Sequence, residues 1–408
     1  MIVIFLNWFD YMTVNRSLQV RFLEIPGIFK DTCSLHSQAL TQCPGYFHAL
    51  FLQVHMRDEG FFVPGICKQV PLPSSGEVPR HSGGMEMKES RGKKKLRRWG
   101  RVLIVFAILA LVICIVKAKA GGTDADQVLT IAEQGFEGHY YDAGEREKAV
   151  ITFSGSEGGS SASDTMAWYY KQNGISALGV TLFAGKETGK NLDRVPLEYV
   201  ENAIAWLKEQ GYEKIAVDGI SKGSEYALLA ASRFPEISCV VARVPSYFVS
   251  EGMIGRKAPS GTACWSYRGE ELSYTPYIIR EFNIIKQFRT YGEFNILSYN
   301  AGKDVTDESI IPVENIHGPI LLISTEADTV WPSAEQAAHL ASYLQEHDYS
   351  YEVKSLTYEN VSHFAIPMRS NIWLLKLMFR SERQFPEECA AERTDLSEQA
   401  VDFIRNHW

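Results

Sequence analysis

The 408 residues include 45% hydrophobic and 22% charged side chains, which is the balance of an ordinary globular protein with chain enough for one large domain and appendages. Residues 121–408 hold 25 Lys and Arg against 41 Asp and Glu, a formal charge of −16, and this argues against nucleic acid as a partner. The seven Cys are scattered without a C-x-x-C pair, so neither a zinc ribbon nor a disulfide scaffold is indicated.

Residues 1–84 show no helical or strand periodicity that lasts, and they end in a Pro- and Ser-rich loop. We predict that this stretch is not a folded domain. It is expected to be a disordered extension, or sequence that lies ahead of a true start at Met85 or Met87.

Residues 85–120 combine a strongly basic flank with an uninterrupted apolar run, residues 102–116. Fifteen apolar residues approach a minimal membrane span, and the basic flank is expected to hold the N-terminal end in the cytoplasm. The small-x-small pattern at residues 118–120 is typical of a signal-peptide cleavage site. Two alternatives stay open, an uncleaved single-pass membrane anchor and a cleaved signal peptide. Both place the catalytic domain outside the cytoplasmic membrane.

Residues 121–408 alternate apolar strands with amphipathic helices after a surface lead-in at 121–148. This alternation predicts an α/β domain with a doubly wound, mostly parallel sheet. The expected strands are 149–153, 177–183, 215–218, 239–244, 319–324 and 351–356. The expected helices are 164–172 with Asp164 as its N-cap, one that begins at Pro196, 333–346 and 397–406. The aromatic-rich residues 249–313 interrupt the alternation of strands and helices. They predict a cap over the active site, with a peripheral insertion as the alternative.

The stretch Gly219-Ile-Ser-Lys-Gly223 lies between an apolar strand and an Ala- and Leu-rich helix. A G-x-S-x-G pentapeptide at such a junction is typical of a nucleophile elbow, in which the Ser occupies a strained turn. The flanking glycines are needed because a Cβ there would collide with the neighbouring strand or helix. We therefore predict Ser221 as the nucleophile.

A serine nucleophile needs a base, and the base needs a carboxylate that orients it. Asp328 follows the predicted strand 319–324, and His363 follows the strand 351–356. The order Ser, acid, His along the chain is the order found behind a nucleophile elbow. Glu326, two residues before Asp328, is the rival acid. The sequence thus predicts a triad of Ser221, Asp328 and His363.

The glycine-rich residues 155–159 follow the first strand of the alternating region. We expect the backbone N–H of Lys222 and one from Ser156 or Glu157 in this loop to form an oxyanion hole. A phosphate-binding loop is the rival interpretation, but the G-x-G-x-x-G spacing is missing. No metal and no organic cofactor is expected.

Five motifs occur in one order: Gly155-Ser-Glu-Gly-Gly, Pro196-Leu-Glu-Tyr-Val, Gly219-Ile-Ser-Lys-Gly-Ser-Glu-Tyr-Ala-Leu, Val313-Glu-Asn-Ile-His-Gly-Pro-Ile-Leu-Leu and Asp328-Thr-Val-Trp-Pro-Ser. With them, the chain from about residue 149 resembles the C-terminal catalytic domain shared by acyl-CoA thioesterases and bile-acid-CoA:amino acid N-acyltransferases. The resemblance implies an α/β-hydrolase fold and a Ser or Cys nucleophile with Asp and His, which map onto Ser221, Asp328 and His363. The family commonly has Gly before the catalytic His, where this chain has Ser362.

The expected function is hydrolysis of an acyl ester or thioester through an acyl-enzyme. Transfer of the acyl group to an amine or alcohol is one alternative, and a non-catalytic binding protein on a hydrolase scaffold is another. The acyl group and the leaving group stay open. Coenzyme A is polyanionic and would be repelled by a domain of charge −16, and it is largely absent outside the membrane.

Overall fold

The computed structural model describes residues 124–255, 258–278, 283–297, 304–368 and 372–408. Residues 1–84 and the apolar run 102–116, with the predicted anchor or signal segment, lie outside this part of the chain. Among the described residues, no helix is both long enough and apolar enough to cross a membrane.

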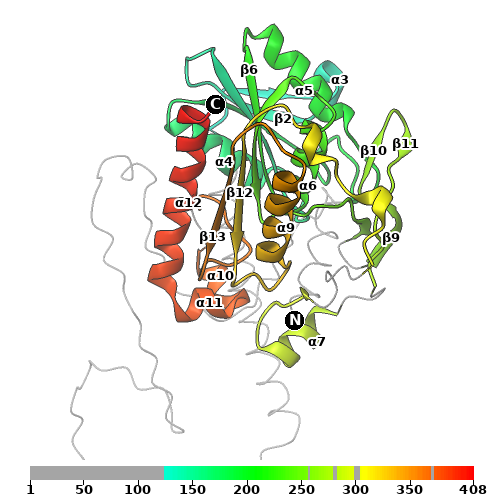
Figure 1. Ribbon diagram of the computed structural model, residues 1–408, viewed down its shortest axis with the longest axis vertical. Helices are drawn as coiled ribbons and strands as arrows, with labels where there is room; N and C mark the ends of the chain where they lie inside the picture. Colours follow the sequence, from blue (N-terminus) through cyan, green and yellow to red (C-terminus); the bar gives the residue numbers. More distant parts are fainter. Residues whose placement is uncertain (1–123, 256–257, 279–282, 298–303, 369–371) are drawn as a thin grey trace, which may run out of the picture. The chain divides into compact units, whose positions relative to one another are not determined.

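One eight-stranded sheet forms the centre, in the order β1-β2-β4-β3-β6-β7-β12-β13 (Figure 1). β2 runs antiparallel to both of its neighbours, β1 and β4. From β4 to β13, all neighbouring strands are parallel. The chain winds outward from β3 in both directions, so the predicted doubly wound sheet is confirmed. The strands of this sheet are β1 (Gln127–Leu129), β2 (Gly138–Tyr141), β3 (Lys148–Phe153), β4 (Ser176–Val180), β6 (Lys214–Ile220), β7 (Ile237–Arg243), β12 (Ile320–Thr325) and β13 (Val353–Tyr358).

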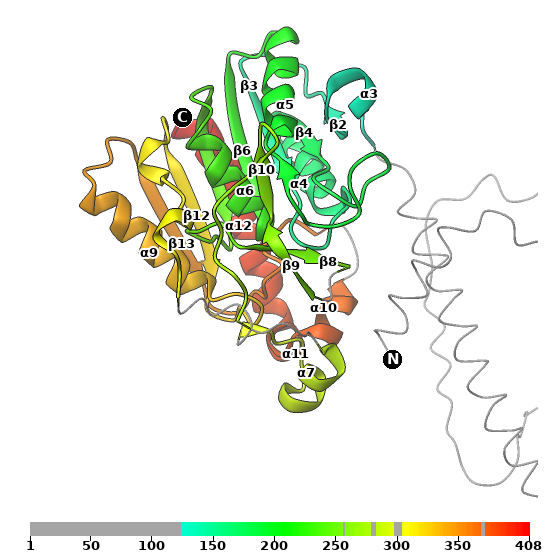
Figure 2. The same ribbon diagram turned by 90° about the vertical axis from the view of Figure 1, so that its right-hand side faces the viewer.

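Helices cover both faces of the sheet (Figures 1 and 2). α5, α6 and α9 pack on one face, and α4 and α12 pack on the other. Along β3 and β6, alternate residues enter opposite cores, as the period of a strand requires. The helices are α3 (Ile131–Gln134), α4 (Ser161–Gln172), α5 (Glu198–Glu209), α6 (Lys222–Ala231), α9 (Ser333–Glu346), α10 (Ile372–Met378), α11 (Arg380–Gln384) and α12 (Pro386–Asn406).

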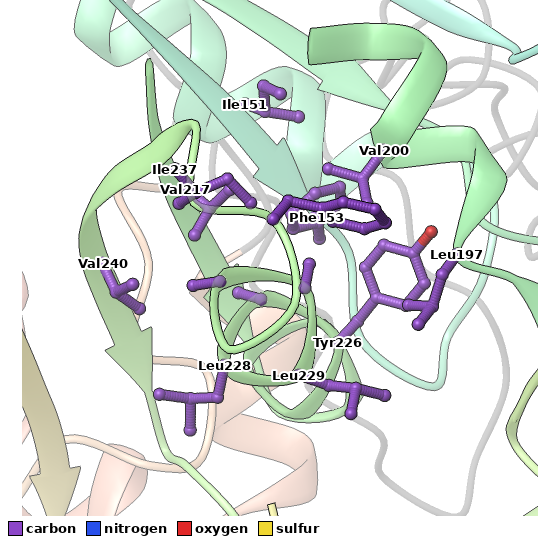
Figure 3. Close-up of a cluster of buried hydrophobic side chains, with 14 of the residues drawn as sticks. Ile151, Phe153, Leu197, Val200, Val217, Tyr226, Leu228, Leu229, Ile237 and Val240 are labelled. Carbon is purple, nitrogen blue, oxygen red and sulfur yellow. The ribbon is translucent and has the colours of Figure 1, made fainter. Parts of the chain in front are cut away.

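The helix α6, which follows the predicted nucleophile, is buried along its whole length. Its Leu228 and Leu229 and the ring of Tyr226 pack into the core between the helices and the sheet, together with Phe153 (Figure 3). Because side chains on every side of this helix pack against other elements, the helix cannot move without disrupting the core. The first residue of this helix is therefore held in place by core packing.

The expectation that residues 121–148 form a surface lead-in is wrong. They supply β1, α3 and β2, and they bury Phe136, Tyr140 and Tyr141. The Tyr140 hydroxyl also meets the Tyr212 hydroxyl at 2.6 Å. Strands of three and four residues are too short to show a period in the sequence, so only the long-range pairing with β4 reveals them.

Asp164 does not cap α4, because this helix begins one turn earlier and has Ser160 at its N-cap. Asp164 instead accepts a hydrogen bond from His139 Nδ1 on β2 at 2.9 Å, which raises the pKa of His139. Three further boundaries differ from expectation. β4 ends at Val180, Pro196 lies in the short strand β5 (Val195–Pro196), and α12 begins at Pro386. The helices α10 and α11 were not expected.

In its described residues, the predicted cap region, residues 249–313, contributes strands to two small sheets and contains the helix α7. One sheet pairs β8 with β9, and the other has the order β11-β10-β5. Because β5 precedes the elbow strand in the chain, this second sheet ties the insertion to the main domain. The elements are β8 (Glu251–Ile254), β9 (Ala258–Ala263), β10 (Trp265–Tyr267), β11 (Glu270–Glu271), α7 (Ile284–Tyr291) and the 3₁₀ turns η1 (Asp307–Ser309) and η2 (Val313–Asn315).

Candidate active site

Ser221 stands at the sharp turn between β6 and α6 with φ 57° and ψ −117°, a conformation that L-residues rarely adopt. A Cβ on Gly219 would lie 2.1 Å from the carbonyl O of Gly223, and a Cβ on Gly223 would lie 2.5 Å from the carbonyl O of Phe153. Only glycine fits at either position. The backbone geometry of the turn is that of the predicted elbow.

Asp328 and His363 meet at the carboxyl ends of β12 and β13. His363 Nδ1 and Asp328 Oδ2 are 2.8 Å apart, and both side chains are buried. The other carboxylate oxygen, Asp328 Oδ1, accepts the backbone N–H groups of Val330 and Trp331 at 2.9 Å each. These two bonds fix the carboxylate so that Oδ2 faces the imidazole. Glu326, the rival acid, is exposed.

Arg243, at the end of β7, connects the elbow with the loop that carries His363. Its carbonyl O accepts the N–H of Ser221 at 2.9 Å, and its Nη1 donates to the carbonyl O of Ala365 at 3.1 Å. The rest of the guanidinium forms a buried ion pair with Asp218 on β6. Burial opposes the charge of Arg243, yet Asp218 raises its pKa above the usual value, so the guanidinium stays charged. The sequence carried no local signal for this link.

The glycine-rich loop, residues 155–159, abuts the elbow. A Cβ on Gly155 would lie 3.1 Å from the Cβ of Ser221 and 2.8 Å from the Glu157 carboxylate. The N–H of Gly155 donates to that carboxylate, and the N–H of Gly159 donates to the carbonyl O of Phe183. The two predicted loop donors, Ser156 and Glu157, lie between these fixed points.

The third predicted donor, the N–H of Lys222, belongs to the first turn of α6. The N–H groups of Ser224 and Glu225 donate to the carbonyl O of Ser221, whereas the N–H of Lys222 comes too early in the helix to reach an intrahelical carbonyl. It lies at the positive end of the helix dipole. The loop and the helix start therefore flank Ser221, which is the placement that an oxyanion hole requires.

Residues 195–368 match the family model described as BAAT / Acyl-CoA thioester hydrolase C terminal. This match confirms the predicted resemblance to the acyl-CoA thioesterase and N-acyltransferase C-terminal family. The matched segment contains Ser221, Asp328 and His363, and it leaves the loop 155–159 outside. A peroxisomal succinyl-coenzyme A thioesterase from Mus musculus is 22% identical over 198 residues. This match spans 48% of the present chain and 44% of the mouse thioesterase.

Solved structures with a related fold include an esterase from Pyrococcus furiosus and a puromycin-hydrolyzing peptidase from Mycobacterium tuberculosis. The esterase is 16% identical, with a TM-score of 0.40, over 69% of this chain and 95% of its own. The peptidase is 16% identical, with a TM-score of 0.41, over 67% of this chain and 37% of its own. At these scores the fold assignment rests on the strand order and the family match.

Ser362, where the family commonly has Gly, has a partner of its own. Its Oγ donates to Glu382 Oε1 at 2.7 Å, and its N–H donates to the same oxygen at 3.2 Å. Glu382 lies in α11 and is ion-paired with Arg393 of α12, whose Nε donates to the carbonyl O of Phe364. The buried ion pair between Glu382 and Arg393 therefore fixes both neighbours of His363, Ser362 and Phe364. Both members of this pair lie outside the matched segment.

Replacing Ser362 with Ala should lower the free energy of unfolding by about 1–2 kcal/mol, because Glu382 loses a buried hydrogen bond. The value of kcat should fall several-fold with KM unchanged, since only the position of His363 changes. Chemical denaturation and steady-state kinetics measure the two effects. Ser381→Ala is the matched control, because the buried Ser381 hydroxyl has no hydrogen-bond partner in the described residues. Equal effects of the two substitutions would contradict a positioning role for Ser362.

Lys222 joins the elbow to the cap region. Its Nζ lies 3.0 Å from Glu225 Oε2, and both side chains are buried. The Glu225 carboxylate also accepts the N–H and Oγ of Ser250 and the Nε1 of Trp265. Burial opposes the charge of Lys222, but the contact with the Glu225 carboxylate raises its pKa, so the ammonium ion persists. This ion pair was not expected from the sequence, although residues three apart on a helix, such as Lys222 and Glu225, lie on the same face.

No group of His, Cys, Asp and Glu side chains in the described residues could hold a metal ion. Cys239, Cys264 and Cys389 are buried free thiols. Burial raises the pKa of Cys264 to about 12, so this thiol near the elbow is protonated at neutral pH and is a poor nucleophile.

Proposed function

We propose that the chain is a serine hydrolase of acyl esters or thioesters, with Ser221, His363 and Asp328 as its triad. The observation that carries the proposal is the 2.8 Å contact between His363 and Asp328 at the same sheet edge as a serine held at φ 57°. A buried carboxylate behind an imidazole fixes its tautomer and stabilises its protonated form. In this proposal, the hydroxyl of Ser221 attacks the acyl carbonyl.

In this mechanism the Oγ of Ser221 attacks the acyl carbonyl carbon while His363 accepts the hydroxyl proton. The N–H of Lys222 and an N–H of Ser156 or Glu157 donate to the oxyanion that forms. The tetrahedral intermediate collapses, the leaving group departs with the proton from His363, and the acyl group stays on Ser221. A water molecule then attacks the acyl carbon while His363 accepts its proton. When this second tetrahedral intermediate collapses, the bond to Ser221 Oγ breaks, His363 returns the proton to that oxygen, and the carboxylic acid leaves. The reaction uses only groups of this chain and water.

For the leaving group we propose a thiol, as in the family to which residues 195–368 belong. The mouse relative is described as a succinyl-coenzyme A thioesterase, and it supports an acyl-CoA thioester as the first substrate to test. The formal charge of −16 over residues 121–408 predicts that affinity for the polyanionic CoA moiety is weak and rises with salt concentration.

Labelling with a fluorophosphonate tests the nucleophile, because this reagent reacts only with an activated serine. Peptide mapping of the full chain should place the adduct on Ser221. Absence of an adduct, with the protein folded by circular dichroism, would favour the non-catalytic alternative. A panel of p-nitrophenyl esters and acyl-CoA thioesters then defines the leaving group. An amide product formed in competition with water, with an amine present, would favour acyl transfer.

A further inference from the structure

Two helical segments meet beside the triad loops, at the lower end of the domain in Figures 1 and 2. One segment is α7, and the other is the pair α10 and α11. The guanidinium of Arg380 donates to the carbonyl O of Tyr291, and Arg383 donates to that of Gly292. The N–H of Phe294 donates to the carbonyl O of Met378. We call the exposed side of these three helices the α7–α10–α11 surface.

This surface exposes large apolar side chains in an unusual concentration. Trp373 is 53% and Leu377 is 58% exposed, and their spacing of four residues places them on one face of α10. The exposed large apolar residues of the surface are Ile285, Tyr291, Trp373, Leu374, Leu377 and Phe385. Exposed large apolar side chains gathered on neighbouring helices mark an interaction site more often than isolated ones do.

The exposed charges on the helices α7, α10 and α11 are all positive. Within residues 283–297 and 373–385, the two acidic side chains, Glu293 and Glu382, are buried and ion-paired. The exposed charged residues there are Lys286, Arg289, Lys376, Arg380 and Arg383. In a region of net charge −16, an apolar patch with five exposed cations on its three helices is electrostatically distinct from the rest of the domain. The first exposed acidic side chains after it, Glu387 and Glu388, belong to the start of α12.

The surface is continuous with the candidate active site. The hydroxyl of Thr329, next to Asp328, donates to the carbonyl O of Phe294 at 2.8 Å. The ring of Phe364, next to His363, packs against Phe379 with ring centroids 5.9 Å apart. Whatever binds the α7–α10–α11 surface therefore lies beside the two loops that carry the acid and the base.

We propose that the α7–α10–α11 surface docks on an anionic lipid bilayer. Trp and Leu side chains enter the boundary between headgroups and acyl chains, and Lys and Arg side chains contact the phosphates. The acidic remainder of the domain is repelled by the same bilayer, so docking also orients the domain with its triad loops toward the lipid. A two-fold contact of this surface with itself fits poorly, because it would set the cationic rim of one copy against that of the other.

Hydrogen–deuterium exchange of the full chain, without substrate, tests the proposal independently of catalysis. The probes are phosphatidylcholine vesicles with and without 30% phosphatidylglycerol. Anionic vesicles should slow amide exchange in residues 284–291 and 372–384 at least threefold, and neutral vesicles should change it less. Because exchange is recorded peptide by peptide, membrane binding through residues 102–116 does not mask the result.

The charge-reversal variant Lys286→Glu/Lys376→Glu should lose this protection, and Trp373→Ser/Leu377→Ser should weaken it. Lys186→Glu/Lys190→Glu is the matched control, since it makes the same change in charge at exposed positions outside residues 283–297 and 372–385 and should keep the protection. The proposal is overturned by unchanged exchange on anionic vesicles, or by protection that survives in the Lys286/Lys376 variant. Protection that appears without vesicles and grows with protein concentration would also overturn it, in favour of self-association.

Discussion

Replacing Ser221 with Ala should reduce hydrolysis of short p-nitrophenyl esters by a factor on the order of 10⁴ or more, because the acyl-enzyme cannot form. The fold should be unaffected, since Ala tolerates φ 57° no better and no worse than Ser. Initial rates with the purified full chain and a thermal unfolding curve measure the two quantities. Activity that persists in this variant would contradict the triad.

Two companion variants separate chemistry from strain. Ser232→Ala, at the far end of the same helix, should leave the rate unchanged and serves as the control. Ser221→Gly should be as inactive as Ser221→Ala but more stable by about 1 kcal/mol, because glycine relieves the positive φ. Equal stability of the Gly and Ala variants would show that the elbow conformation costs nothing.

Replacing Arg243 with Met should lower the free energy of unfolding by about 3–5 kcal/mol. The substitution leaves Asp218 as a fully buried carboxylate without its cation, with only the hydrogen bond from Tyr170. Turnover should also fall, because the carbonyl O of Ala365 loses its donor and the loop that carries His363 loosens. Urea denaturation and kcat for one ester measure the two effects.

The double variant Asp218→Asn/Arg243→Met distinguishes these two contributions. Removing both charges should restore most of the stability. The rate should stay low, because no donor reaches Ala365. Arg146→Met is the control for a lost ion pair, since Arg146 and Asp142 are partly exposed, and it should cost less than about 1 kcal/mol. Full recovery of both stability and rate in the double variant would assign Arg243 to stability alone.

Much of the fold was predictable because its strands are buried on both faces. The runs that became β3, β6, β7 and β12 are continuous and apolar, and each was expected within three residues of its observed bounds. The elbow was predictable because the G-x-S-x-G pattern lies between an apolar strand and an apolar helix. Gly219 is required by a contact with Gly223, four residues on, although Gly223 is required by a contact with the distant Phe153. The helix that was expected to begin at Pro196 is present as α5, and it buries Val200, Ala203, Ile204 and Leu207 on one face.

The rest depends on contacts that the sequence does not display. β1 and β2 are too short to show a period. Asp164 has the chemistry of a helix cap, but it meets His139 from a strand that was not expected. Arg243 and Glu382 lie far along the chain from the groups they hold, so no spacing rule links them to His363. The candidate triad could thus be predicted from motifs. The buried contacts of Arg243 and Glu382 that fix the loop of His363 could not.

The pairing of β6 bears on which piece of this chain can exist alone. The family segment, residues 195–368, includes the strand that carries Ser221 but omits β3, with which that strand pairs from Lys214 to Gly219. It also omits α12, which covers one face of the sheet and anchors the loop before His363 through Glu392. In a fragment limited to residues 195–368, β6 would lack β3, and its backbone N–H and C=O groups on that side would be unpaired. Such an exposed hydrophobic strand edge promotes aggregation. The segment that sequence comparison recognises is therefore smaller than the unit that must fold together, and expression boundaries belong outside β1 and α12.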